Sequence, residues 1–208
     1  MKYKLLLWDF DGTLADTLSI ALAIYNRMAS EKNFRAIEDP HAVRSMGMRE
    51  FLKSHQIPAH QIPFAFRTFL KELRRLATEV RLNEGVAAVV TGIAALDIAQ
   101  GVVSSNDTDT IRICLEHNGV ADAFTYVSGT SRIFGKERRI RKAITQCGCA
   151  ASDVLYVGDE VRDIEASRAA GLDVASVTWG LNNREALMAC RPTYLVSHPD
   201  ELLGILGS

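Results

Sequence analysis

The chain has 208 residues, enough for one hydrophobic core of ordinary size and a small inserted subdomain. Its hydrophobic fraction of 48%, charged fraction of 24% and formal net charge of -1 are those of an ordinary folded domain and exclude a disordered or collagen-like chain. The balance of charge predicts no nucleic-acid partner, since the basic cluster Lys136 to Lys142 includes Glu137 and is expected to form a solvated helix face.

We expect a cytoplasmic protein with no membrane partner. The first residues, Met1 to Trp8, hold only a four-residue apolar run, which Asp9 interrupts before a signal-peptide core could form. No later stretch approaches the length of a membrane span. The four cysteines form no CxxC pair, so we interpret them as reduced thiols. Cys114 lies at a helical apolar spacing from Ile111 and is expected in the core.

Short apolar runs bounded by polar or glycine residues recur along the chain, and most are rich in branched or aromatic side chains, as buried strands are. The predicted strands are Lys4–Phe10, Val102–Ser104, Phe124–Ser128, Val154–Val157, Leu172–Val177 and Tyr194–Val196. Helical apolar spacings lie between several of them, and three of these segments are followed by Gly119, Gly148 and Gly171, which favour helix ends. The alternation predicts a Rossmann-like α/β fold with a parallel sheet.

One segment breaks the alternation. From about Asp16 to Arg81 there is helical periodicity without a convincing strand, and Asp39-Pro40 has the pattern of a helix start. We therefore predict a small helical cap, residues 16–81, inserted after the first strand into a core made of residues 1–15 and 82–208.

Polar residues follow three of the predicted strands, at the edge where doubly wound sheets bind ligands. Asp9-Phe10-Asp11-Gly12-Thr13 places two carboxylates two residues apart at the end of an apolar strand, so that one can attack while the other moves protons. Gly12 suits a tight turn that brings backbone close to a ligand. The alternative is that Asp-Gly-Thr forms only a turn.

A second acidic pair, Asp159 and Asp163, follows another predicted strand. Helical spacing would put both on one face, and a cluster of carboxylates repels itself unless a hard cation neutralises it. Mg²⁺ prefers oxygen ligands, so we expect it as the cofactor, with Asp159 as a direct ligand and Asp163 as a supporting residue. The alternative is a helix cap and a solvated carboxylate.

Two weaker signals concern phosphate. Ser104-Ser105-Asn106 precedes a predicted helix, where a hydroxyl and free backbone N–H groups can bind phosphate, although Ser and Asn are also common caps. Lys136 follows Gly135 at a helix start, and its ammonium could pair with phosphoryl oxygens and a nucleophilic carboxylate, or be solvated. The residues expected to bind phosphate are Gly12, Thr13, Ser104, Ser105, Asn106 and Lys136.

These elements, in this order, resemble the haloacid dehalogenase-like hydrolase superfamily over nearly the whole chain outside the insertion. The resemblance implies that Asp9 is the nucleophile and Asp11 the general acid and base, with the Asp11 backbone carbonyl joining Asp9 and Asp159 on magnesium. The remaining motifs of the family match Ser104, Lys136 and Asp159 with Asp163. The insertion stands where the family's type-1 cap stands.

The second aspartate of the motif, Asp11, is absent from true dehalogenases, so the resemblance implies a phosphatase acting through an aspartyl phosphate, similar to phosphoglycolate phosphatases. A phosphomutase or a non-catalytic interaction protein on the same scaffold stays open. We expect a small phosphorylated metabolite as the substrate and a monomer or homodimer. Arg44 and Gly47, in a break between cap helices, are expected to contribute to substrate specificity.

Overall fold

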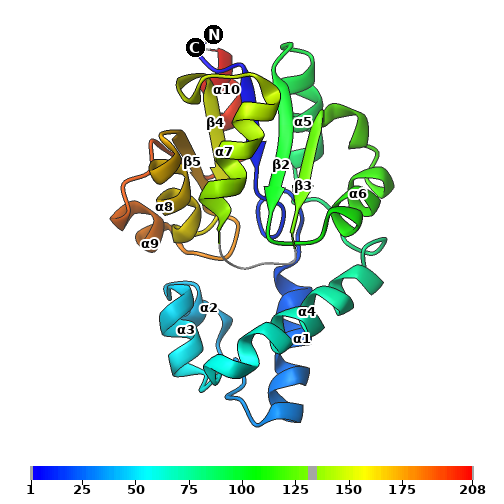
Figure 1. The fold of residues 1–208 in the computed structure, drawn as a ribbon, viewed down its shortest axis with the longest axis vertical. Coiled ribbons are helices and arrows are strands. Elements are labelled where there is room, and N and C mark those ends of the chain that lie inside the picture. Colours follow the sequence, from blue (N-terminus) through cyan, green and yellow to red (C-terminus); the bar gives the residue numbers. More distant parts are fainter. Residues whose placement is uncertain (1, 131–134, 208) are drawn as a thin grey trace.

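The structure is a computed structural model and describes residues 2–130 and 135–207. Its centre is a parallel sheet in which the described strands follow the order β3-β2-β1-β4-β5-β6 (Figure 1). The strands are β1 (Leu5–Trp8), β2 (Ala99–Ser104), β3 (Tyr126–Gly129), β4 (Val154–Gly158), β5 (Asp173–Val177) and β6 (Tyr194–Val196). The predicted α/β fold is confirmed, and the strand order reverses between β1 and β4, where doubly wound sheets open their ligand crevice.

Helices cover both faces of the sheet because side chains of β1 alternate between two hydrophobic clusters. Leu5 and Leu7 pack in the cluster with α7, α8 and α9, whereas Leu6 and Trp8 pack in the cluster with α5, α6 and α10. The core helices are α5 (Val86–Ala94), α6 (Thr108–His117), α7 (Lys136–Cys147), α8 (Val161–Ala170), α9 (Arg184–Ala189) and α10 (Glu201–Gly207). Cys114 is fully buried in the second of these clusters, as predicted.

The division of the chain into a core and an inserted domain of residues 16–81 stays a prediction. Helices lie between β1 and α5, and Figure 1 shows them beyond the carboxyl ends of the strands. They are α1 (Leu18–Lys32), α2 (Pro40–Val43), α3 (Met48–Ser54), the 3₁₀ turn η1 (Ala59–Gln61) and α4 (Ile62–Arg75). We call this segment the cap. Asp39 caps α2 by accepting a hydrogen bond from the His41 amide at 2.9 Å, as its sequence pattern predicted.

The two chain crossings into the cap lie side by side. The Asp16 amide donates to the Arg81 carbonyl at 2.9 Å, and Ala15 and Leu82 form an antiparallel bridge. The two crossings therefore pair with each other next to the loop that follows β1.

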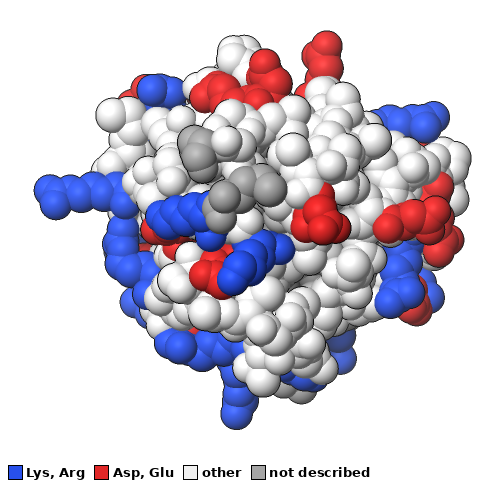
Figure 2. All heavy atoms as spheres, turned by 90° about the horizontal axis from the view of Figure 1, so that it is seen from above, with Lys and Arg blue, Asp and Glu red and all other residues white. Residues whose placement is uncertain are grey.

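One face of the molecule agrees with the balanced charge of the sequence. On the face viewed in Figure 2, basic and acidic side chains are interspersed, and no extended patch of one sign covers the described residues of this face. Within residues 2–130 and 135–207, no helix combines the length and the apolar character needed to cross a membrane.

Candidate active site

The candidate site lies at the carboxyl ends of β1 and β4, and its centre is a buried cation between two carboxylates. The Lys136 ammonium lies 2.6 Å from Asp9 Oδ2 and also contacts Asp163 Oδ1. Lys136 is the first residue of α7, directly after Gly135, whose φ of 86° lets the chain turn toward the sheet. Burial alone would lower the pKa of Lys136, but the charges of Asp163 and Asp9 outweigh it and hold the pKa well above its usual value.

Asp159 is held in place by a hydroxyl and an amide. Thr13 donates its hydroxyl to Asp159 Oδ1 at 2.6 Å, and the Leu181 amide donates to Oδ2 at 2.6 Å. Gly12 has a φ of 78°, and a Cβ there would lie 2.5 Å from Asp159 Oδ2, so the turn after β1 needs glycine on both counts. Gly12 thus lies against the Asp159 carboxylate, and its approach to a ligand stays a prediction.

Three carboxylates converge here: Asp9, Asp159 and Asp163 are buried, and each offers an oxygen within 4.8 Å of the others. The pKa of Asp159 is raised well above its ordinary value by burial and then by the charges of Glu160, Asp163 and Asp9. Oxygen donors that repel one another in a buried position suit a hard divalent cation, and this donor set fits Mg²⁺. The residues present therefore fit the cofactor expected from the sequence.

The prediction that helical spacing places Asp159 and Asp163 on one helix face is wrong, because Asp159 lies outside the helix. Asp159 precedes α8, whose N-cap is Glu160, and Asp163 is the third residue of the helix. The Asp163 carboxylate reaches back to accept the Glu160 amide at 3.1 Å, and this capping box turns it toward Lys136. Burial raises the pKa of Asp163, and the charge of Lys136 opposes that shift.

Asp11 faces a different partner. The side-chain amide of Asn106 donates to both Asp11 carboxylate oxygens at 3.2 Å. The pKa of Asp11 is raised to about 7, first by burial and then by the charge of Asp9, while Asn106 and Thr17 oppose the shift through hydrogen bonds. A carboxyl group that titrates near neutral pH can both donate and accept a proton.

The helix α6 is capped by a residue other than Ser104, Ser105 or Asn106. Asp107 is the N-cap residue and accepts the Thr110 amide at 3.0 Å, so capping does not account for Ser104 and Asn106. Asn106 is fully buried against Asp11, and Ser104 Oγ accepts the Asn106 amide at 3.1 Å. Ser104 and Ser105 are also buried at this edge of the sheet, and their role toward phosphate stays a prediction.

Two residues at the site, Arg162 and Asn83, were not predicted from the sequence. Arg162 pairs with Glu160, and although burial would lower its pKa, the charges of Glu160, Asp163 and Asp9 raise it. Its position between the two predicted aspartates was the available signal. Asn83 donates its side-chain amide to the Gly12 carbonyl at 3.1 Å and so holds the turn after β1. Nothing in its sequence neighbourhood indicates that contact.

The two cap residues expected to choose the substrate lie between α2 and α3. Arg44 donates from its guanidinium to the carbonyls of Thr178, Gly180 and Leu181, at 2.8 to 3.2 Å. These guanidinium N–H groups thus donate to carbonyls of the loop after β5, and a contact of Arg44 with substrate stays a prediction. Gly47 is exposed and begins α3 as its N-cap residue.

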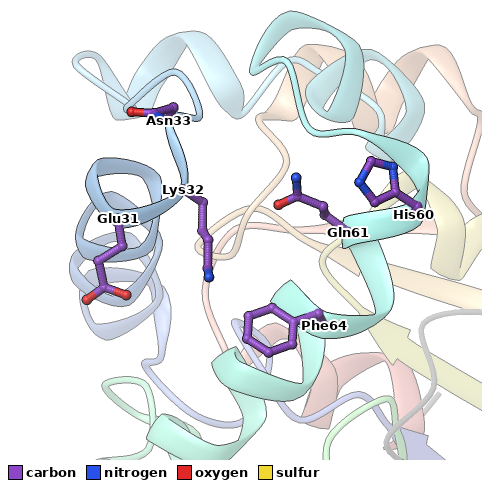
Figure 3. A pocket seen from close by; sticks show the side chains of 6 residues that line it. All are labelled: Glu31, Lys32, Asn33, His60, Gln61 and Phe64. Carbon is purple, nitrogen blue, oxygen red and sulfur yellow. The ribbon is translucent and has the colours of Figure 1, made fainter.

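A hollow in the cap is separate from this chemistry. It lies between the end of α1 and the start of α4 (Figure 3). Lys32 lies 4.9 Å from the centre of the Phe64 ring, and that ring is 49% exposed. The hollow is lined by Glu31, Lys32, Asn33, His60, Gln61 and Phe64. None of these is a predicted site residue, so we assign the hollow no part in the reaction.

The chain was compared with models of known protein families, and the result agrees with the order and the geometry of the site residues. Residues 6–177 match the model of the haloacid dehalogenase-like hydrolases, and the chain belongs to this family. The resemblance inferred from the motifs is confirmed.

This chain aligns with nearly the whole length of several relatives that are named phosphatases. The phosphoglycolate phosphatase of Synechococcus elongatus is 30% identical over 95% of this chain and 94% of its own. The N-acetylmuramic acid 6-phosphate phosphatase of Pseudomonas putida is 26% identical over 100% of this chain and 98% of its own. The pyrophosphatase PpaX of Bacillus velezensis is 25% identical over 97% and 95%.

Solved structures of low sequence identity share the fold. A haloacid dehalogenase-like hydrolase from Streptococcus pneumoniae superposes with a TM-score of 0.83 at 19% identity and covers 99% of both chains. CbbY from Rhodobacter sphaeroides, solved in complex with phosphate, gives a TM-score of 0.75 at 17% identity and covers 96% of both chains. These likenesses extend over the cap as well as the sheet.

Proposed function

We propose that this chain is a Mg²⁺-dependent phosphatase that hydrolyses a small phosphorylated metabolite through a phosphoryl group carried on Asp9. The supporting observation is the difference between the two carboxylates of the motif. Asp9 forms an ion pair with Lys136, whereas the pKa of Asp11 is raised to about 7 by burial and the charge of Asp9. An aspartate acts as a nucleophile in its ionised form, whereas a general acid must carry a proton near neutral pH. The two aspartates of the motif therefore suit these two roles.

In the first step, a carboxylate oxygen of Asp9 attacks phosphorus and the bond from phosphorus to the leaving oxygen breaks. Asp11 gives its proton to that oxygen. In the second step, the ionised Asp11 takes a proton from water as the water oxygen attacks phosphorus, which releases Asp9 and inorganic phosphate. Asn106, on both Asp11 oxygens, keeps that carboxyl group oriented through both steps.

Catalysis of phosphoryl transfer depends mainly on stabilising the negative charge of the phosphoryl group that is transferred. Lys136 is already between Asp9 and Asp163 and can pair with phosphoryl oxygens next to the nucleophile. Ser104 lies at the same edge of the sheet. Asp9 and Asp159, with the backbone carbonyl of Asp11 and with Asp163 as a supporting residue, would hold Mg²⁺, which when bound supplies positive charge to the phosphoryl oxygens.

For the substrate, we propose a small anionic phosphate ester of the phosphoglycolate type. This rests on the 30% identity to a protein named phosphoglycolate phosphatase, while relatives at 25 to 26% carry names with other substrates. The cap, including Arg44 and Gly47, would contact the leaving group and exclude water from the first step. The four free cysteines agree with a cytoplasmic location.

The test is release of inorganic phosphate from a panel containing 2-phosphoglycolate, N-acetylmuramic acid 6-phosphate, pyrophosphate and several sugar phosphates, each with Mg²⁺ and with EDTA. We expect Mg²⁺-dependent release, fastest from 2-phosphoglycolate. Isomerisation of a sugar phosphate without phosphate release would identify a mutase. No conversion of any member at millimolar Mg²⁺ would leave the scaffold as an interaction protein and contradict the proposal.

A further inference from the structure

The loop between β5 and α9, residues 178–183, contacts the cap through hydrogen bonds in both directions. From the cap, the Arg44 guanidinium donates to three of its carbonyls, the shortest being Gly180 at 2.8 Å. From the loop, the Asn182 side-chain amide donates to the Arg44 carbonyl at 3.0 Å and to the Met46 carbonyl at 3.3 Å. The Asn183 backbone amide donates to the Arg44 carbonyl at 2.9 Å. The segment between α2 and α3 is thus docked onto this one loop.

The same loop supports the carboxylate Asp159. The Leu181 amide donates to Asp159 Oδ2 at 2.6 Å, and the Asn182 amide donates to the Asp159 carbonyl at 3.2 Å. Gly180 packs against this aspartate so closely that a Cβ would overlap the Asp159 side chain. The position of Asp159 therefore depends on the path of the loop.

Asn182 belongs to both sets of contacts. It is 3% exposed, and its side-chain oxygen accepts the amide of Val161, the first residue of α8, at 2.9 Å. Its amide nitrogen turns the other way and donates to the cap. One buried side chain therefore joins the cap, the loop and the start of the helix that carries Asp163. Leaving a buried side-chain amide without its hydrogen-bond partners costs free energy. The contacts of Asn182 with the cap and its contact with the start of α8 therefore favour each other.

We propose that Asn182 is a positioning residue that, together with Arg44, couples docking of the cap to the position of Asp159. This inference rests on the proposed function, in which Asp159 holds Mg²⁺. Because coupling between two equilibria is reciprocal, docking of the cap tightens Mg²⁺ binding and bound Mg²⁺ favours the docked cap. The enzyme would then assemble its charged site only as the cap closes over the substrate.

Two backbone amides report the two ends of this connection separately. The acceptor of the Asn183 amide belongs to the cap, and the acceptor of the Leu181 amide is Asp159 itself. Arg44→Ala leaves both acceptors in the chain, since one is a backbone carbonyl and the other a different side chain. A change in their exchange therefore reports movement of the cap and of Asp159, and not simple deletion of a partner.

The experiment measures amide hydrogen exchange by NMR and Mg²⁺ affinity by calorimetry, both without substrate, on the wild type, Arg44→Ala, Arg44→Lys and Asn182→Ala. Arg49→Ala, which removes an exposed arginine from α3, is the matched control. We expect Arg44→Ala to speed exchange at Asn183 and Leu181 about tenfold and to raise the Mg²⁺ dissociation constant roughly 5- to 50-fold. Arg44→Lys should be intermediate, and the control should match the wild type.

In the wild type, Mg²⁺ should slow exchange at Asn183, and this effect should shrink in Arg44→Ala. Faster exchange at Asn183 with unchanged exchange at Leu181 and unchanged Mg²⁺ affinity would overturn the coupling. If Asn182→Ala does not fold, Arg44→Ala decides the question. If the wild type releases no phosphate from any ester, the proposed function fails, while the exchange at Leu181 still decides whether the cap positions Asp159.

Discussion

Lys136→Met should destabilise the metal-free protein strongly, because the ammonium is the cation placed between Asp9 and Asp163. The Lys136 side chain is 6% exposed, and those of Asp9 and Asp163 are 3% and 0% exposed. Removing one partner from a buried ion pair costs roughly 3–5 kcal/mol, since the remaining charge stays buried and unpaired. Methionine has a similar length and leaves little cavity, so we expect a loss of about 3–4 kcal/mol at pH 7.5.

The sign of the pH dependence follows from the same carboxylates. Burial raises the pKa of Asp163, and the loss of Lys136 removes the larger of the two charges that oppose this rise, the other being Arg162. The pKa of Asp163 should therefore rise further in the variant, so that acid protonates the folded state and removes the unpaired charge. The loss should therefore shrink by at least 1 kcal/mol between pH 7.5 and pH 5, about one pKa unit of linkage.

Urea unfolding in EDTA at both pH values measures this, with Lys142→Met as the control because Lys142 is an exposed lysine of the same helix. The control should lose less than about 0.5 kcal/mol. Millimolar Mg²⁺ should restore more stability to Lys136→Met than to the wild type. A loss below about 1 kcal/mol, or one that does not change with pH, would refute the reasoning.

Three further predictions concern the same site. In EDTA, the folded state keeps a proton on Asp11 up to about pH 7, whereas the unfolded chain loses it near pH 4. The contribution of Asp11 to the free energy of unfolding is therefore fully present below pH 4 and is lost as the pH rises through 7. Asp11→Asn should therefore gain roughly 1–3 kcal/mol relative to wild type between pH 5 and pH 8 by urea unfolding, and a pH-independent difference would contradict this. Gly12→Ala should lower the free energy of unfolding by roughly 2–4 kcal/mol and weaken Mg²⁺ binding. Gly119→Ala is the control, because Gly119 has a φ of 70° but open space for a Cβ, so backbone strain alone should cost about 1–2 kcal/mol. Equal losses in the two variants would exclude the contact with Asp159. Phosphate release should stop in EDTA and return with Mg²⁺ rather than Zn²⁺, since the site offers oxygen donors, and activity that survives chelation would remove the metal from the account.

The sheet was readable from the sequence because its strands are short, apolar and separated by polar or glycine residues. All six predicted strands overlap a strand of the structure, with ends differing by a few residues. The helix α5, Val86–Ala94, gave no signal, since its residues are nearly all small or apolar and show no polar face. The helices α9 and α10 are too short for a period to be recognised.

The candidate site was readable where residues stand next to a strand end, as Asp9, Asp11 and Asp159 do. The partners that orient them were not, because those contacts depend on how distant segments meet. Asn106 is 95 residues from Asp11, and Asn182 is 136 residues from the Met46 carbonyl that its amide contacts. Polar residues in loops carry no period, so a sequence alone does not indicate their partners.

The account depends most directly on a phosphoryl group carried by Asp9. Asp11→Asn removes the base needed for the second step, while p-nitrophenyl phosphate, with its good leaving group, needs little help from an acid in the first. The measurement is to mix this variant with p-nitrophenyl phosphate and Mg²⁺, quench in acid and map the peptides by mass spectrometry. We predict one added phosphoryl group on Asp9 and none when Asp9→Asn is also present. A phosphoryl group on another residue, or nitrophenol released in a single-turnover burst without any phosphorylated peptide, would contradict the account.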